Sequence, residues 1–133
     1  MIFVDSNVLI DLFENDPQWR AWSGSHLSLA LEEDVLAVNV VVYAEIARSF
    51  PDTDAVDVFL AEFGIGLEPI PREAAFAASR AHQRYRRAGG ARIATLPDFF
   101  IAAHAQAAGA RLLTRDAMRV RTYFPDLTVI APA

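Results

Sequence analysis

The 133-residue sequence contains no cysteine, which excludes disulfides, thiolate metal sites and cysteine nucleophiles together. It also contains no lysine, because all 12 basic residues are arginines, and this excludes reactions that need a catalytic lysine. No apolar run approaches the roughly 18–20 residues of a membrane-spanning helix, and no basic segment precedes the short apolar run at the N-terminus, as it would in a signal peptide. We therefore expect a cytoplasmic protein without a membrane segment.

Positive charge is also scarce, since the formal net charge is −5 at neutral pH. Proteins that coat nucleic-acid duplexes are usually basic, so the composition disfavours broad, nonspecific binding of this kind. A small acidic site that holds cations is compatible with it. Hydrophobic residues make up 53% of the chain, enough for a real core at this length. We predict one domain over residues 1–133.

Short β-branched runs alternate with longer helical patterns, which is typical of a parallel sheet connected by helices. The pattern predicts an α/β fold, a three-layer α/β/α sandwich with a central, mainly parallel five-stranded sheet. Ligands of such sheets bind beyond the carboxyl ends of the strands. The predicted strands are 2–5, 35–39, 67–70, 111–114 and 127–130, and the predicted helices are 8–14, 17–33, 41–50, 53–63, 72–88, 97–108 and 116–123.

Four acidic residues lie close to the predicted strand ends. Asp5 ends the first strand, in MIFVDSN, and Asp116 follows the fourth, in LLTRD. Glu45 lies about one helical turn beyond the second strand, and Asp98 lies in the first turn of the helix before the fourth. If strands one and four are neighbours, three of these acids approach one edge of the sheet.

Each acid also has a purely structural interpretation. Asp5 or Ser6 suits the N-cap of the first helix, Asp116 suits that of the last, and Thr95-Leu96-Pro97-Asp98 matches a capping box. Glu45 could pair with Arg48 on the same helix. Together, however, the carboxylates would repel one another by about 3 kcal/mol per pair at about 5 Å and an effective dielectric constant of about 20. A bound cation removes that penalty, and oxygen donors favour Mg²⁺ or Mn²⁺.

The chemistry indicated by such a site is metal-assisted hydrolysis of a phosphodiester. A bound metal lowers the pKa of its water and neutralises charge on the leaving oxygen, so no histidine is required. The three histidines are scattered in the sequence. His104 follows Asp98 by six residues, about 240° around a helix, so the two do not share a face.

The sequence resembles the PIN-domain ribonucleases, and within them the VapC-type toxins of toxin–antitoxin pairs. The matching stretches are MIFVDSNVLID, VVVYAEI, LPDFFIAAHAQAAGARLLTRD and YFPDLTVIAP, which occur in the expected order over essentially the whole chain. The resemblance implies cleavage of RNA by a Mg²⁺- or Mn²⁺-dependent endoribonuclease. It also implies a homodimer that a cognate antitoxin protein silences.

The resemblance assigns roles to the residues at the strand ends. It implies that Asp5, Glu45, Asp98 and Asp116 form the catalytic, metal-binding quartet, and we expect Asp5, Asp98 and Asp116 as metal ligands. The supporting polar residues that it implies beside the metal are Ser6 or Asn7, and Thr114. All four acidic positions are filled, so no departure from the family pattern predicts an inactive protein.

An arginine cluster could offset the acidic net charge if RNA is the substrate. Arg80, Arg84 and Arg87 form a stripe along the predicted helix 72–88, and Arg92 lies in the loop before Asp98. These arginines could hold RNA phosphates. A solvated helix face or a contact with the antitoxin explains them equally well.

Other families and functions fit less well. The receiver domains of response regulators and the haloacid-dehalogenase-type phosphatases both use a lysine, which this chain lacks. No GxxxxGK motif of a P-loop enzyme is present. The remaining alternative is a PIN-like fold that serves as an RNA- or protein-binding module without nuclease activity.

Overall fold

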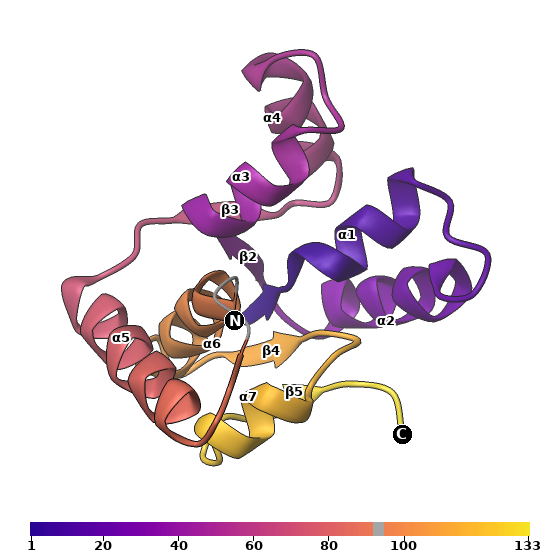
Figure 1. Ribbon diagram of the computed structural model, residues 1–133. Helices are drawn as coiled ribbons and strands as arrows, with labels where there is room; N and C mark the ends of the chain where they lie inside the picture. Colours follow the sequence, from indigo (N-terminus) through magenta and orange to yellow (C-terminus); the bar gives the residue numbers. More distant parts are fainter. Residues whose placement is uncertain (92–94) are drawn as a thin grey trace.

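The computed structural model describes residues 1–91 and 95–133 and has a five-stranded, entirely parallel sheet at its centre (Figure 1). The strand order is β3-β2-β1-β4-β5. The strands are β1 (Ile2–Val4), β2 (Leu36–Asn39), β3 (Gly66–Glu68), β4 (Arg111–Leu113) and β5 (Val129–Ile130). The helices are α1 (Ser6–Phe13), α2 (Arg20–Glu33), α3 (Val40–Ala47), α4 (Thr53–Glu62), α5 (Arg72–Arg87), α6 (Leu96–Ala107) and α7 (Met118–Tyr123).

The central position of β1 explains its uninterrupted apolar sequence. All three of its residues are at most 1% exposed, since helices cover both faces of the sheet. Its neighbours are β2 and β4, and its register against β4 pairs Val4 with Leu113. The next residues along the two strands are Asp5 and Thr114, so the register brings these two polar side chains together at the carboxyl edge.

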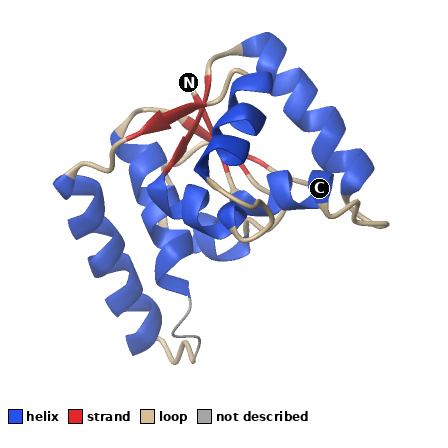
Figure 2. Cartoon of the chain, turned by 90° about the horizontal axis from the view of Figure 1, so that it is seen from above, coloured by secondary structure: helices blue, strands red, loops and turns tan. Residues whose placement is uncertain are grey.

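The helices form two groups that cover the sheet. α1 packs along α2, and α5 packs along α6 (Figures 1 and 2). α6 is buried on most sides, as its apolar sequence predicts, because it lies between α5 and the sheet. The predicted three-layer sandwich and the pairing of strands one and four are confirmed.

The predicted starts of three helices are wrong. The second helix begins at Arg20 rather than at Pro17, because the carboxylate of Asp16 accepts hydrogen bonds from the amides of Gln18 and Trp19 and forms a turn there. The first helix begins at Ser6, directly after β1, and not at residue 8. The last begins at Met118 and not at residue 116. Within the described residues, no helix combines the length and the hydropathy needed to cross a membrane.

Asn39 connects two helices beneath the carboxyl edge of the sheet. It is fully buried at the end of β2, and its Oδ1 accepts hydrogen bonds from the amides of Val41 and Val42, which caps α3. Its Nδ2 lies 3.2 Å from Nδ1 of His104 on α6. Burial lowers the pKa of His104, which favours a neutral ring whose Nδ1 accepts this hydrogen bond. One amide therefore fixes α3, which carries Glu45, relative to α6, which carries Asp98.

We predict that Asn39→Ala lowers the free energy of unfolding by about 2–4 kcal/mol, because it removes a helix cap and leaves the buried His104 acceptor unpaired. Asp52→Ala is the matched control, since Asp52 caps α4 from an exposed position and makes no second side-chain hydrogen bond within the described residues. It should cost only about 1 kcal/mol. Urea unfolding followed by circular dichroism measures both values. Equal losses for the two variants would contradict the connecting role of Asn39.

Candidate functional site

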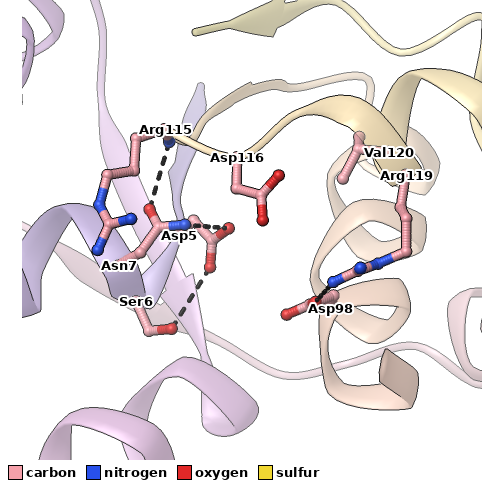
Figure 3. A pocket seen from close by; sticks show the side chains of 8 residues that line it. All are labelled: Asp5, Ser6, Asn7, Asp98, Arg115, Asp116, Arg119 and Val120. Carbon is pink, nitrogen blue, oxygen red and sulfur yellow. Dashed lines mark hydrogen bonds and ion pairs between the residues drawn. The ribbon is translucent and has the colours of Figure 1, made fainter. Parts of the chain in front are cut away.

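A pocket of about 230 Å³ opens at the carboxyl edge of the sheet. It contains three of the four predicted acids, Asp5, Asp98 and Asp116, which come from the end of β1, the first turn of α6 and the segment after β4 (Figure 3). The other residues that line it are Ser6, Asn7, Arg115, Arg119 and Val120. Residues far apart in the sequence therefore converge as the strand ends predict.

Asp5 is the most buried of these acids. Its residue is 7% exposed, and burial raises the pKa of its carboxyl group to about 7, with smaller contributions in the same direction from the charges of Asp98 and Glu45. A hydrogen bond from Thr114 opposes this shift but does not cancel it. The pocket therefore concentrates negative charge around a carboxylate that has little water to stabilise it.

Three polar side chains hold the Asp5 carboxylate in place. The hydroxyl of Thr114 donates to Oδ2 at 2.8 Å, and Nδ2 of Asn7 donates to the same oxygen at 3.4 Å. The hydroxyl of Ser6 lies 3.4 Å from Oδ1. The backbone amide of Arg115 donates to Oδ1 of Asn7, which fixes the orientation of the Asn7 amide. The three supporting residues predicted from the sequence therefore all lie beside Asp5.

Glu45 lies next to the pocket but does not line it. Its Oε1 accepts a 2.9 Å hydrogen bond from Ser6, so Ser6 connects Glu45 to Asp5. Burial raises the pKa of the Glu45 carboxyl group, and the charge of Asp98 adds to this effect. The pairing of Glu45 with Arg48, considered as a structural alternative, is not seen as an ion pair among the described residues, where Arg48 instead lies 3.9 Å from Glu14.

Asp98 forms an ion pair with Arg119, whose Nη2 lies 3.3 Å from Oδ2 of Asp98. The Asp98 side chain is 38% exposed and faces the pocket (Figure 3). Asp116 is exposed, and its backbone amide donates to the hydroxyl of Thr114. Within the described part of the chain, no three acidic or histidine side chains are arranged to hold a metal ion together.

The structure does not support the capping roles considered for Asp5 and Asp116. Asp5 occupies the N-cap position of α1, yet among the described residues its side chain forms no capping hydrogen bond. The N-cap of α7 is Ala117, so Asp116 lies outside the helix. The carboxylates of Asp5 and Asp116 are therefore not needed to begin the helices that follow.

The sequence analysis did not identify the two arginines of the pocket or the buried residues behind one of them. Arg115 and Arg119 line the pocket, and Nε of Arg115 lies 2.8 Å from the buried carboxylate of Asp11. Asp11 also accepts a 2.7 Å hydrogen bond from the hydroxyl of Ser23. The sequence signal that could have revealed this contact is Asp11, a charged residue within the apolar run VLIDLF, because a buried carboxylate requires a partner.

The arginine stripe lies away from the pocket. Arg80, Arg84 and Arg87 are exposed on α5, and none of them lines it. Arg80 lies over the ring of Phe76, 4.7 Å from its centre, and Nη2 of Arg84 lies 3.4 Å from the backbone oxygen of Tyr123. Arg92 lies outside the described residues.

The raised pKa of Asp5 predicts a pH-dependent stability in metal-free solution. The folded protein keeps the Asp5 proton up to about pH 7, whereas the unfolded chain releases it near pH 3.8. The unfolded state therefore binds fewer protons between these values, and the contribution of Asp5 to stability falls as the pH rises through this window. The lost stability is on the order of 4 kcal/mol above pH 7.

Asp5→Asn removes this titration, so its free energy of unfolding should exceed that of the parent by an amount that grows from pH 4 to pH 8. Urea unfolding in EDTA at several pH values measures the difference. Asp126→Asn, at an exposed position outside the pocket, should give a nearly constant difference. If the free energies of unfolding of Asp5→Asn and the parent came closer together as the pH rises, the prediction would be contradicted.

Comparison with solved structures shows close similarity over essentially the whole chain. VapBC2 from Rickettsia felis, bound to a DNA fragment from its promoter, has a TM-score of 0.73 at 18% identity, and the match covers 100% of both chains. A toxin–antitoxin complex from Klebsiella pneumoniae has a TM-score of 0.72 at 22% identity, covering 100% of this chain and 98% of that one. FitAcB from Neisseria gonorrhoeae has a TM-score of 0.64 at 22% identity, covering 98% and 96%.

At these identities the solved structures establish a shared fold. No curated protein matches the sequence. The sequence model of the PIN domain matches residues 2–125, a range that contains every residue of the pocket. The chain therefore belongs to the PIN domain family.

Proposed function

We propose that the protein is a metal-dependent endoribonuclease that hydrolyses RNA phosphodiester bonds. The observation that carries this proposal is the convergence of Asp5, Asp98 and Asp116 in one pocket, with Asp5 buried and its pKa raised. Excess negative charge at a sheet edge is what a divalent cation would compensate. The membership of the PIN domain family points to the same chemistry.

The donor set of the pocket fits Mg²⁺ or Mn²⁺. The available ligands are carboxylate, amide and hydroxyl oxygens, which hard divalent cations prefer. Asp5, Asp98 and Asp116 would hold the ion after moving closer together than they lie in this structure, where Asp98 pairs with Arg119. When bound, the ion would lower the pKa of its water and neutralise charge on the leaving oxygen. Thr114, Asn7 and Ser6 orient Asp5, and Ser6 couples it to Glu45, the fourth proposed catalytic acid.

The proposed biological role is that of a VapC-type toxin in a type II toxin–antitoxin system. It is supported by the stretches of sequence that resemble this group and by the similarity to a VapBC assembly and to a toxin–antitoxin complex. The proposal includes a cognate antitoxin, a homodimer and a cytoplasmic location.

A binding module without nuclease activity is the second candidate. The ion pair between Arg119 and Asp98 favours it, because Arg119 already neutralises one proposed metal ligand. Metal binding requires Asp98 to exchange this partner for the cation. The two candidates therefore differ in whether the protein cleaves RNA and whether the acids of the pocket are needed for that cleavage.

We expect the purified protein to cleave RNA in the presence of Mn²⁺ and to lose this activity in EDTA. Asp5→Asn should slow cleavage by on the order of 1000-fold, because a metal site contributes several kcal/mol to the stabilisation of the transition state. Asp126→Asn is the matched control, since it removes the same charge outside the pocket, and its rate should equal that of the parent. Gel analysis of a panel of labelled RNAs measures the rates. Equal cleavage by the parent and Asp5→Asn would exclude the assigned site, and no cleavage by any variant would favour the binding module.

The arginine stripe gives a separate prediction. If Arg84 and Arg87 contact RNA phosphates, replacing both with alanine should weaken RNA binding. The slope of the logarithm of the binding constant against the logarithm of the salt concentration should also become smaller by about 0.7 for each lost contact. Fluorescence anisotropy over a series of salt concentrations measures both quantities with Asp5→Asn protein. Unchanged affinity and salt dependence would indicate that the stripe contacts a protein partner or only solvent.

A further inference from the structure

Arg115 is held beside the acidic pocket by residues that the proposed chemistry does not use. Its Nε lies 2.8 Å from Oδ2 of Asp11, and its guanidinium lies over the ring of Trp19, 5.6 Å from the ring centre. Asp11 is 1% exposed, and Ser23, which donates to the same Asp11 oxygen, is fully buried. One edge and one face of the guanidinium are therefore occupied.

The two terminal nitrogens of Arg115 remain available. Within the described residues, neither forms a hydrogen bond or an ion pair, and the side chain is 29% exposed. The side chain lines the pocket, and in Figure 3 its guanidinium lies on the side of Asp5 opposite to Arg119. A planar guanidinium with both terminal nitrogens free matches the geometry of a phosphate group.

The ion pair between Asp11 and Arg115 is not by itself evidence of a stabilising role. A buried ion pair is often no more stable than an apolar replacement of the same volume. The pair does, however, fix the direction of an otherwise flexible side chain, which reduces the entropy lost when that side chain binds a ligand. Asp11 follows Asp5 by six residues, on the helix that begins directly after Asp5.

We propose that Arg115 binds a backbone phosphate of the RNA next to the one cleaved, and that Asp11 and Ser23 are positioning residues that aim its terminal nitrogens at that phosphate. The inference rests on the proposed function, because a strand whose scissile phosphate lies at the acids carries further phosphates along the same surface. A neighbouring phosphate near Asp5 and Asp116 needs a local cation, and Arg115 supplies one.

Arg115→Lys tests this inference without changing the net charge. A lysine ammonium can pair with Asp11, which preserves the fold, but it has no second and third nitrogen to present to a phosphate. We expect a short, fluorescein-labelled single-stranded RNA to bind about tenfold more weakly to Asp5→Asn/Arg115→Lys than to Asp5→Asn. The slope of the logarithm of the binding constant against the logarithm of the salt concentration should become smaller by about 0.7. Arg72→Lys, at a 96% exposed side chain outside the pocket, is the control and should leave both values unchanged.

A second substitution separates positioning from a structural effect. Adding Asp11→Asn to the Arg115→Lys protein releases the ammonium from its buried partner, so RNA affinity should partly recover. A residue that only stabilised the fold would give a further loss. RNA binding by Asp5→Asn/Arg115→Lys equal to that of Asp5→Asn, or an unchanged or further reduced affinity on adding Asp11→Asn, would overturn the inference. Neither result would bear on metal-dependent cleavage by the unmodified protein. Failure of the proposed function would appear differently, as no cleavage by the unmodified protein.

Discussion

The burial of one carboxylate, that of Asp5, is the constraint on which the rest of the site depends. A buried acid is costly unless neighbouring groups compensate for the water it has lost. β1 is the central strand of the sheet, so Asp5 at its carboxyl end is held by apolar packing behind it and by Thr114, which directly follows the adjacent strand β4. The other acids approach from separate elements, and the charges of Asp98 and Glu45 add to the raised pKa of Asp5 although Arg119 pairs with Asp98.

Two buried polar connections keep those elements in place. Asn39 caps α3 and reaches His104 on α6, so the helices that carry Glu45 and Asp98 share one hydrogen-bonding residue. Asp11 on α1 pairs with Arg115 after β4. Each connection crosses between elements that the sheet alone would leave free to shift. Precise placement of the side chains at the sheet edge thus depends on polar contacts beneath it as well as on apolar packing.

Most of the fold could be predicted from the sequence because its signals are local. Apolar runs such as Ile2–Val4 and the helical pattern of Arg72–Arg87 depend on neighbouring residues, and parallel strands bring their carboxyl ends to one edge. The pairing of Arg119 with Asp98 could not be predicted, since it depends on how α7 is placed against α6. The turn formed by Asp16 was missed because Pro17 is equally suited to open a helix.

The strand order affects when the site can form as the chain is synthesised and folds. β1 pairs with β2 and with β4, and the contact between Asp5 and Thr114 spans 109 residues of sequence. Such distant contacts form late, because the loop must close before the contact stabilises anything. During synthesis, Asp5 emerges 109 residues before Thr114, so this hydrogen bond cannot form until the segment after β4 has been made. The acidic pocket therefore cannot be complete while only the first strands and helices are present.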